Sequence, residues 1–412
     1  MHSRDCTIHE RDRDRAALLV NAVDVAIVGA GPVGASLALA LRDARLRVAL
    51  IDAAPAAPQV VPAADWDSRI WALNPTSVAF LGQIGVWPLL DSLRVERCVG
   101  MRVAGDRGTA LEFNAYDARV EALAFMLEAR ALSRALAIQL AAASHVTRVV
   151  GQPVRLDRDA SVATITLDSG ESIAASVIVG ADGGESWVRS TAGIVVDEYD
   201  YHAQGVVANF RCERPHHGVA YQWFRRETES HTSILAYLPL PRNMMSMVWS
   251  TSDAHARTLL SLPEDALTAQ VTNAGERVLG ALQITTPARS FPLKRVSPRS
   301  IVDDRIALVG DAAHVIHPLA GQGVNLGFGD AQSLARIIVG REVFRDPGDA
   351  RVLARYKRDR AEAILAMRTV THGLERLFAQ PGAAAQWVRS TGLAVTDRLV
   401  VIKNLLARHA LG

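Results

Sequence analysis

The segment that decides the fold is Val25-Ala26-Ile27-Val28-Gly29-Ala30-Gly31-Pro32-Val33-Gly34, which has the pattern of a buried strand, a glycine-rich turn and the start of a helix. Gly29, Gly31 and Gly34 fit G-x-G-x-x-G, in which the glycines allow a tight turn, close backbone approach to a pyrophosphate, and close packing of helix on strand. The phosphates of a dinucleotide would lie at the helix N-terminus, where free N–H groups and the dipole favour negative charge. The alternative is a tight turn without a ligand.

The residues after the turn favour the nucleotide site. Apolar residues continue at helical spacing, and a second apolar strand, residues 47–51, ends at Asp52. Asp52 lies 18 residues after Gly34, close to the roughly 20 residues expected for a carboxylate that binds the adenosine ribose. A carboxylate in that position disfavours a 2′-phosphate on the same ribose.

A second motif near the end of the chain has the same strand–loop–helix character. The apolar segment 306–309 runs into Gly310-Asp311, and then into His317-Pro318-Leu319-Ala320-Gly321-Gln322-Gly323-Val324-Asn325. An acid that follows a buried strand lies where α/β sheets place their ligands. Gly321 and Gly323 would let the backbone approach a ligand without a Cβ clash. An ordinary glycine-rich connection is the alternative.

Composition limits the class of protein. The chain has 412 residues, of which 49% are hydrophobic and 21% charged, and this suits a soluble protein with two or three domains. The formal net charge is +2, so charge gives no argument for nucleic acid or an acidic membrane as partner. Cys6, Cys98 and Cys212 are scattered, so we expect neither a disulfide framework nor a metal site. This cysteine usage is typical of a protein in a reducing compartment.

The chain divides into segments of different character. Residues 1–22 are predicted to be a disordered charged extension, because Asp12, Asp14 and Asp24 interrupt any secretion signal. No transmembrane helix is expected, because glycine and proline punctuate the apolar runs. Residues 125–142 are predicted to be a helix, and residues 162–173 a hairpin arm with a turn at Asp168-Ser169-Gly170. Short strand-like stretches between residues 198 and 292 indicate a separate antiparallel sheet.

Several of these segments resemble the class A flavin-dependent aromatic hydroxylases. The similarity is greatest to the ubiquinone-biosynthesis hydroxylase branch and more distant to p-hydroxybenzoate hydroxylase. It covers most of residues 24–412, and the HP-x-AGQG-x-NLG run at 317–327 is its most specific element. The other matching segments are the glycine turn, Asp67-Ser68-Arg69 with residues 81–87, the "DG" motif at 180–189, Phe291-Pro292-Leu293 and residues 407–412.

The resemblance implies an α/β fold with a Rossmann-like FAD-binding domain of the p-hydroxybenzoate hydroxylase and glutathione reductase type. An antiparallel β-sheet substrate domain is inserted into it, and helices follow at the C-terminus. We therefore expect residues 23–100, 125–197 and 293–345 to form the discontinuous FAD-binding domain, residues 101–124 and 198–292 the substrate domain, and residues 346–412 the C-terminal helical region. FAD would be bound non-covalently, and NADPH or NADH would be the transient electron donor.

The resemblance also implies roles for particular residues. Asp311 would accept hydrogen bonds from the ribityl chain, and the helix that opens near Gly321 would direct N–H groups at the flavin pyrimidine edge, which stabilises negative charge on the reduced ring. Pro318 would hold its loop against the isoalloxazine, and His317 and Pro318 are the catalytic candidates. The predicted cofactor-binding residues are Gly29, Gly31, Gly34, Asp52, Arg69, Asp182, Gly183, Gly310, Asp311, Pro318, Gly321, Gln322, Gly323, Val324 and Asn325.

Alternatives accompany three of these residues. Asp182, expected near the pyrophosphate, fits equally the cap of the helix that follows it. Arg69, expected near the flavin and pyrophosphate, could be a solvated surface arginine. A lone histidine such as His317 is more often structural than catalytic. Two positions depart from the branch: Glu128-Ala129 stands where Glu-Asn is usual, and His372 where an acid is expected.

The activity implied by the resemblance is hydroxylation of a phenolic ring, preferably of a polyprenylated ubiquinone precursor, by dioxygen through a C4a-hydroperoxyflavin. The sheet of residues 198–292 would roof the pocket and exclude water. No second G-x-G-x-x-G occurs, so flavin movement is expected in place of a second nucleotide domain. Aromatic residues of this sheet are candidates for the pocket wall or for the core: Tyr221, Trp223, Phe224 and Trp249.

Other readings remain open at this point. A reductase, a dehydrogenase or a halogenase could share the fold, although the W-x-W-x-I-P halogenase motif is absent. A non-catalytic assembly factor that keeps FAD is another alternative, and residues 310–325 argue against a plain NAD-dependent dehydrogenase. The basic amphipathic segment 398–408 would touch a membrane or a partner, or pack on its own domain. We accordingly expect a cytoplasmic protein with peripheral contact at the inner face of the membrane or with a biosynthetic complex.

Overall fold

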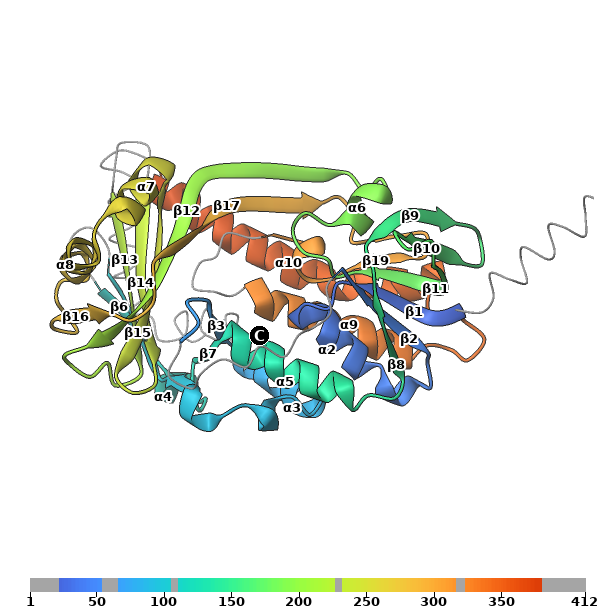
Figure 1. Ribbon diagram of the computed structural model, residues 1–412, viewed down its shortest axis with the longest axis horizontal. Helices are drawn as coiled ribbons and strands as arrows, with labels where there is room; N and C mark the ends of the chain where they lie inside the picture. Colours follow the sequence, from blue (N-terminus) through green and yellow to red (C-terminus); the bar gives the residue numbers. More distant parts are fainter. Residues whose placement is uncertain (1–21, 54–65, 105–109, 227–231, 316–322, 380–412) are drawn as a thin grey trace, which may run out of the picture.

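The computed structural model describes residues 22–53, 66–104, 110–226, 232–315 and 323–379. These residues form two large β-sheets at opposite ends of an elongated molecule, and a small three-stranded sheet (Figure 1). In Figure 1 the sheet that contains the glycine turn lies on the right, and the second large sheet lies on the left. The combination confirms the predicted α/β fold with an additional antiparallel sheet.

The first large sheet contains five parallel strands whose carboxyl ends meet at one edge. Their order is β19-β11-β1-β2-β8, and each neighbouring pair is parallel. The predicted strands that lead into the two glycine motifs, β1 and β19, thus lie in one sheet, with β11 between them. The bounds are β1 (Ala22–Val28), β2 (Val48–Asp52), β8 (Val146–Val150), β11 (Ser172–Gly180) and β19 (Ile306–Leu308), with β18 (Val302–Asp303) antiparallel to β19.

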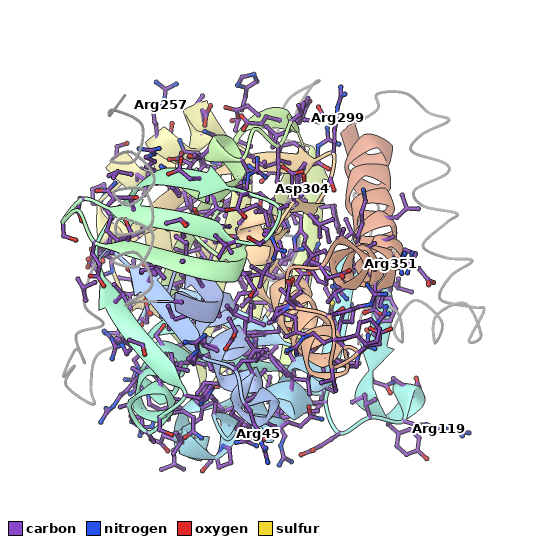
Figure 2. The ribbon with its side chains drawn as sticks, turned by 90° about the vertical axis from the view of Figure 1, so that its right-hand side faces the viewer. Arg45, Arg119, Arg257, Arg299, Asp304 and Arg351 are labelled. Atoms are coloured by element: carbon purple, nitrogen blue, oxygen red, sulfur yellow. The ribbon has the colours of Figure 1, made fainter. Side chains whose placement is uncertain are left out.

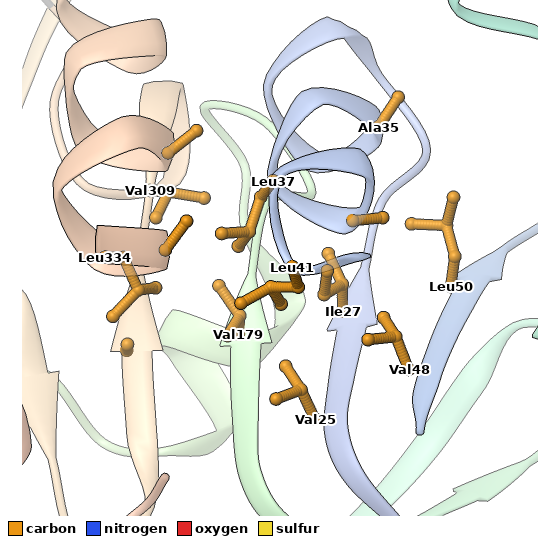
Figure 3. Close-up of a cluster of buried hydrophobic side chains, with 14 of the residues drawn as sticks. Val25, Ile27, Ala35, Leu37, Leu41, Val48, Leu50, Val179, Val309 and Leu334 are labelled. Carbon is orange, nitrogen blue, oxygen red and sulfur yellow. The ribbon is translucent and has the colours of Figure 1, made fainter. Parts of the chain in front are cut away.

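The hydrophobic core of this sheet forms beneath three helices. Helix α2 (Pro32–Ala40) packs against α5 (Ala129–Ala141) and α9 (Gly323–Val339). Figure 3 shows Leu37 of α2 above Ile27 and Val179 of the sheet, with Leu334 of α9 beside them, and all four side chains are fully buried. Each such side chain stabilises the fold by roughly 1.5–3 kcal/mol.

Two predicted elements can be compared directly with the structure. The hairpin is confirmed, since β10 (Ala163–Leu167) pairs antiparallel with β11 across the turn at residues 168–170, and β9 (Pro153–Arg158) extends it. The prediction of one helix over residues 125–142 is wrong in its first part. Residues 124–128 form strand β7 (Ala124–Glu128), and helix α5 begins only at Ala129. Pairing of β7 with β3 (Ile70–Leu73) and β4 (Glu96–Cys98) explains the strand.

The second large sheet is antiparallel for most of its width, with the order β16-β12-β15-β14-β13-β5-β6. Its longest strand, β12 (Val196–Cys212), pairs with β17 (Arg289–Pro298), and the two run together between the sheets (Figure 1). Helices α7 (Asp253–Ser261) and α8 (Glu264–Ala274) accompany this sheet. The remaining strands are β5 (Gly100–Ala104), β6 (Ala110–Asn114), β13 (Val219–Arg226), β14 (Thr232–Leu240), β15 (Met244–Ser252) and β16 (Leu282–Ile284).

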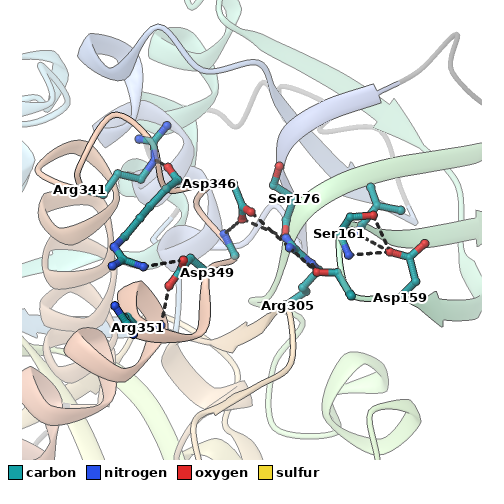
Figure 4. A network of polar contacts seen from close by, with 12 residues as sticks. Asp159, Ser161, Ser176, Arg305, Arg341, Asp346, Asp349 and Arg351 are labelled. Carbon is teal, nitrogen blue, oxygen red and sulfur yellow. Dashed lines mark hydrogen bonds and ion pairs between the residues drawn. The ribbon is translucent and has the colours of Figure 1, made fainter.

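Helix α10 (Ala350–Ala379) follows α9 and packs against it. The connection between the two helices is tied to the first sheet by Arg305, whose guanidinium binds Asp346 at 2.9 Å and the carbonyl of Ser176 at 2.8 Å (Figure 4). The shorter helices are α3 (Pro75–Gln83), α4 (Ala115–Ala118) and α6 (Trp187–Thr191).

Charged side chains such as Arg45, Arg119 and Arg257 project from the surface (Figure 2). Cys98 and Cys212 are buried free thiols. Every helix within the described ranges is too short or too polar to traverse a lipid bilayer.

Candidate functional site

The candidate site lies at the carboxyl edge of the parallel strands. Four predicted residues end or follow strands that are neighbours there: Gly29 after β1, Asp52 at the end of β2, Asp182 after β11 and Gly310 after β19. Backbone hydrogen bonds hold the strand ends together, since Ala181 N donates to Val28 O and Val309 N donates to Gly180 O. Residues from distant parts of the sequence thus share the edge at which α/β sheets bind ligands.

The three glycines of the first turn have distinct reasons to lack a side chain. Gly29 has φ +104°, and a Cβ there would lie 2.4 Å from the carbonyl oxygen of Ala181. A Cβ on Gly34 would lie 2.0 Å from the oxygen of Gly29, so helix and turn touch at that point. Gly31 differs, because no atom of the described residues lies within 4 Å of its would-be Cβ. Gly29 and Gly34 therefore serve the protein's own packing, while Gly31 leaves space open.

Helix α2 begins beside this open space. Gly31 is its N-cap, Pro32 is its first residue and no side chain caps it. Proline at this position is compatible with helix geometry and gives up an N–H that has no partner within the helix. The remaining N–H groups and the dipole make the end of α2 suited to a phosphate.

Asp52 is held against the glycine turn. Its Oδ2 accepts a 2.7 Å hydrogen bond from the backbone N–H of Ala30. The predicted ribose acid and the predicted phosphate turn are therefore in direct contact, although 22 residues separate them in sequence.

Asp182 shows features of both alternatives. Its Oδ2 accepts a 3.0 Å hydrogen bond from Val188 N in helix α6, which is a capping interaction. Its Oδ1 is buried, and no donor in the described part of the chain reaches it. Gly183, the next residue, has φ +84° and faces open space. An unpaired buried carboxylate oxygen is costly unless a ligand or water satisfies it.

Asp311 follows β19 in the short turn η5 (Gly310–Ala312). Its carboxyl group is accessible to solvent but enclosed by protein on several sides. This partial desolvation raises the pKa of Asp311, while His314 and Arg69 act in the opposite direction. Arg69, predicted near the flavin, is therefore close enough to Asp311 for their charges to interact, and its own guanidinium lies 5.5 Å from the ring centroid of Trp71.

The start of helix α9 is fixed by the side chain of Asn325, a predicted cofactor-binding residue. Asn325 accepts a 3.0 Å hydrogen bond from Asn74 N and donates a 2.8 Å hydrogen bond to Ala72 O. Its amide is thus used to hold α9 against the β3–α3 connection. Gly323 faces open space and Val324 is half-buried. His317, Pro318, Gly321 and Gln322 lie outside the described residues, so both catalytic candidates remain predictions.

A cavity of about 880 Å³ runs from the glycine turn toward the second large sheet. Ala30, Pro32 and Ala35 line one part of it, and Arg211, Met244 and Arg289 line another. Of the predicted site residues in the described ranges, Arg69 lines this cavity. The three glycines of the turn do not line it, but the adjacent residues Ala30 and Pro32 do. The remaining lining residues are Trp66, Asp67, Ser68, Trp71, Ala129, Arg130, Ser133, Arg134, Leu136, Ala137, Leu140, Arg148, Thr285, Thr286 and Pro287.

Several cavity residues were not predicted from the sequence. Arg130 and Arg134 lie one turn apart on α5, and Arg148 lies on β8, beside Leu50 of β2. Their positive charge suits an anionic ligand next to the α2 N-terminus. Their signal in the sequence is weak, because arginines at helical spacing usually form a solvated helix face. Trp66 adjoins the Asp67-Ser68-Arg69 match, which is the one signal that could have identified it.

Glu128, which precedes the departure at Ala129 noted above, is buried beneath the cavity and holds two neighbouring segments together. It is 2% exposed, accepts a 2.6 Å hydrogen bond from Arg94 Nε and accepts a 2.7 Å hydrogen bond from Asp67 N. Asp67 in turn accepts hydrogen bonds from Arg69 N and Arg130 N. These contacts fix the segment that carries Arg69, and Ala129 beside Glu128 lines the cavity.

The four aromatic candidates for a pocket wall lie elsewhere. Trp223, Phe224 and Trp249 are buried in the cores beside the second sheet, and Tyr221 stacks on Trp223. None of the four lines the cavity of the described residues. The aromatic residues that do line it are Trp66 and Trp71.

FAD fits the residues present at this site. The open space at Gly31 beside the uncapped end of α2 suits its pyrophosphate, and Asp52 suits its adenosine ribose. The unpaired Oδ1 of Asp182 and the accessible carboxyl group of Asp311 provide acceptors for hydroxyl or amide groups. Arg130, Arg134 and Arg148, which line the cavity, suit its charge.

Comparison with known proteins agrees with this geometry. A family model described as FAD binding domain matches residues 22–371. Ubiquinone hydroxylase UbiL of Rhodospirillum rubrum and 3-demethoxyubiquinol 3-hydroxylase of Escherichia coli are each 33% identical over 94% of this chain, and the alignments cover 89% and 98% of those proteins. Ubiquinone biosynthesis monooxygenase COQ6 of Drosophila melanogaster is 30% identical over 94% of this chain and 90% of its own length.

Solved structures show the same fold at lower identity. PqsL of Pseudomonas aeruginosa, described as a probable FAD-dependent monooxygenase, has a TM-score of 0.74 and 23% identity over 91% of this chain and 100% of its own. HpxO of Klebsiella pneumoniae, solved with FAD and uric acid, has a TM-score of 0.71 and 17% identity over 93% of this chain and 97% of its own.

Proposed function

This chain belongs to the FAD-binding domain family and to its ubiquinone-biosynthesis hydroxylase branch, and on that premise we propose that it hydroxylates the phenolic ring of a polyprenylated ubiquinone precursor. The observation that carries the proposal is the shared strand edge: the Gly29–Gly34 turn, Asp52 and the Gly310–Asp311 turn meet there, beside a cavity that continues to the second sheet. One end suits a dinucleotide, and the other offers space for an aromatic ring.

The residues that would hold FAD follow the length of the site. Gly31 and the N–H groups of α2 would receive the pyrophosphate, and Asp52 the adenosine ribose. Arg130, Arg134 and Arg148 would offset the phosphate charge. We propose that the other predicted contacts, namely Gly29, Gly34, Arg69, Asp182, Gly183, Gly310, Asp311, Pro318, Gly321, Gln322, Gly323, Val324 and Asn325, border the remaining length of the cofactor.

FAD, when bound and reduced by NADPH or NADH, supplies the activation of dioxygen. The residues of this chain position the ring and keep water away from it. Met244, Thr285 and Thr286 contribute to the cavity wall on the side of the second sheet, where the phenol would enter. His317 and Pro318 remain our candidates for residues that face the ring.

Oxygen labelling tests the proposal. The purified chain is reconstituted with FAD and supplied with NADPH or NADH, oxygen-18-labelled dioxygen and a prenylated phenol. A product that carries one labelled oxygen is expected by mass spectrometry. Donor oxidation that releases only peroxide with every phenol tried would favour a reductase. Failure to retain FAD would overturn the proposal, and tight FAD binding without any donor oxidation would favour an assembly factor.

We also propose that the protein binds peripherally to the inner face of the membrane, where its apolar substrate is concentrated. The basic amphipathic segment 398–408 supports this proposal. Flotation with anionic lipid vesicles should recover the full chain and lose it when residues 398–412 are deleted. Equal recovery of both forms, or recovery of neither, would contradict this assignment.

A further inference from the structure

Asp330 is a fully buried acid that no sequence motif singled out. It lies on helix α9 with 0% of its surface exposed. Its Oδ2 accepts a 3.0 Å hydrogen bond from the backbone N–H of Gly310 and lies 2.5 Å from His314 Nε2. Its Oδ1 accepts a 2.7 Å hydrogen bond from Nε of Arg360 on helix α10.

The charge of Asp330 is retained in the protein interior. Burial alone would raise the pKa of Asp330, but His314 and Arg360 outweigh this effect and hold that pKa below its usual range. The balancing charge of Arg360 comes from a different helix, and its guanidinium also donates to the carbonyl of Leu326 on α9. A buried carboxylate that loses one partner strongly destabilises the folded state. The stability of this part of the fold therefore depends on Asp330, His314 and Arg360 together.

The position of Asp330 connects this charge to the cofactor site. Its carboxylate binds Gly310, the first residue of the turn that contains Asp311, and His314, which lies just after that turn. The turn has little freedom on its other side, because a Cβ on Gly310 would lie 3.1 Å from Val33 of α2. Asp330 therefore holds the Asp311 turn from α9, while α2 confines it from the nucleotide side.

From this geometry we propose that Asp330 and Arg360 are positioning residues for the cofactor: Arg360 on α10 fixes Asp330, and Asp330 fixes the turn that presents Asp311 to FAD. The inference rests on the proposed function, since it assumes that Asp311 binds FAD. It assigns to helix α10, which contributes no lining residue to the cavity within the described ranges, a role in cofactor affinity.

The competing explanation is that Arg360 only joins α10 to α9. The chain offers a matched control for this alternative. Arg336 of α9 and Asp359 of α10 form an ion pair of 2.7 Å between the same two helices, and Arg336 is 63% exposed. This pair does not touch Asp330, so removing it weakens the helix contact and leaves the Asp311 turn held. If Arg360 matters only for helix packing, Arg360→Gln and Arg336→Gln should have similar consequences.

The test compares FAD affinity with stability of the apoprotein in the full chain. FAD dissociation constants come from quenching of flavin fluorescence, and apoprotein melting temperatures from circular dichroism. Arg360→Gln and Asp330→Asn should weaken FAD binding by roughly 10- to 100-fold, by analogy with the loss of residues that orient the ligands of a metal ion. Arg360→Lys, which keeps the charge, should restore part of the affinity, and Arg336→Gln should leave the constant within about twofold of the wild type.

The outcomes separate this inference from the proposed function. If the wild-type chain binds no FAD, the proposed function itself fails. If the wild type binds FAD and Arg360→Gln binds it equally well, only the positioning role is refuted. An equal loss of affinity in Arg360→Gln and Arg336→Gln also refutes it. If Arg360→Gln does not fold, the FAD dissociation constants of Arg360→Lys and Arg336→Gln are compared instead. A dissociation constant for Arg360→Lys no higher than that for Arg336→Gln refutes the positioning role.

Discussion

The backbone N–H of Ala30 and the carboxylate of Asp52 are joined by a 2.7 Å hydrogen bond across the carboxyl ends of β1 and β2. This contact fixes the orientation of the acid before any ligand arrives. A preorganised acceptor loses less conformational freedom on binding than a mobile one. The Ala30–Asp52 contact therefore leads to a quantitative expectation for cofactor affinity.

Asp52→Ala should weaken FAD binding by roughly 10- to 100-fold, because a hydrogen bond to a charged group contributes about 1.5–3 kcal/mol. Fluorescence titration measures the constant. Asp24→Ala is the matched control, since Asp24 also accepts a 2.7 Å hydrogen bond from a backbone N–H, that of Arg47, at the opposite end of β1. The Asp24→Ala substitution should change the stability of the protein and leave FAD affinity unchanged. Equal affinities of the Asp52 and Asp24 variants would contradict the ribose assignment.

Gly31→Ala and Gly34→Ala should fail in different ways. Gly31 has an ordinary φ of −62° and open space around it, so alanine there should leave the apoprotein stable but obstruct the pyrophosphate. Gly34→Ala would place a Cβ 2.0 Å from Gly29 O, and such overpacking costs about 1–3 kcal/mol or more. Urea unfolding of the apoproteins and FAD titration separate the two effects. Undiminished FAD affinity in Gly31→Ala would show that the phosphates lie elsewhere.

Glu128→Ala should destabilise the fold by about 3–5 kcal/mol, because it leaves the partly buried guanidinium of Arg94 without its 2.6 Å partner. Urea unfolding measures the change. Glu121→Ala provides the comparison: Glu121 and Arg97 form a 2.9 Å pair on the surface, where each side chain is 63% exposed, so its loss should cost about 0–1 kcal/mol. Similar decreases in the free energy of unfolding for both variants would mean that the Arg94–Glu128 pair stabilises the fold no more than a surface ion pair.

The parts of the site that could be predicted from sequence are those that short-range geometry determines. Gly29, Gly34 and Asp52 belong to one strand–helix–strand unit, and the connection of that unit places the end of β2 beside the turn. The Gly310–Asp311 turn was likewise identifiable because an apolar strand leads directly into it.

The parts that escaped prediction depend on contacts between distant segments. The run Phe125–Leu127 is apolar and continues into a helix without a break, and only its pairing with β3 makes it a strand. Periodicity cannot distinguish a short buried strand from a buried helix turn. Arg148 and Arg360 carry no local signal either, because their function depends on cavity and helix neighbours far away in sequence.

Asp311→Asn should make the apoprotein more stable at neutral pH while it weakens FAD binding. Desolvation raises the pKa of Asp311 in the folded state, so ionising this carboxyl group at neutral pH opposes folding. The amide carries no charge and escapes that cost. Because the folded pKa lies above the unfolded value, the penalty in the wild type is fully present above the folded pKa. It disappears as the pH falls below the unfolded value of about 3.9.

Melting temperatures of the wild type and Asp311→Asn apoproteins, measured from neutral pH down to about pH 3, should therefore converge as the acid is protonated. Asp304→Asn is a suitable control for the loss of one negative charge, because Asp304 is an exposed acid outside the site. In the same samples, FAD affinity of Asp311→Asn should be lower than that of the wild type at neutral pH. A variant that is less stable than the wild type at neutral pH would show that the Asp311 carboxylate serves the fold and is not held in place for a ligand.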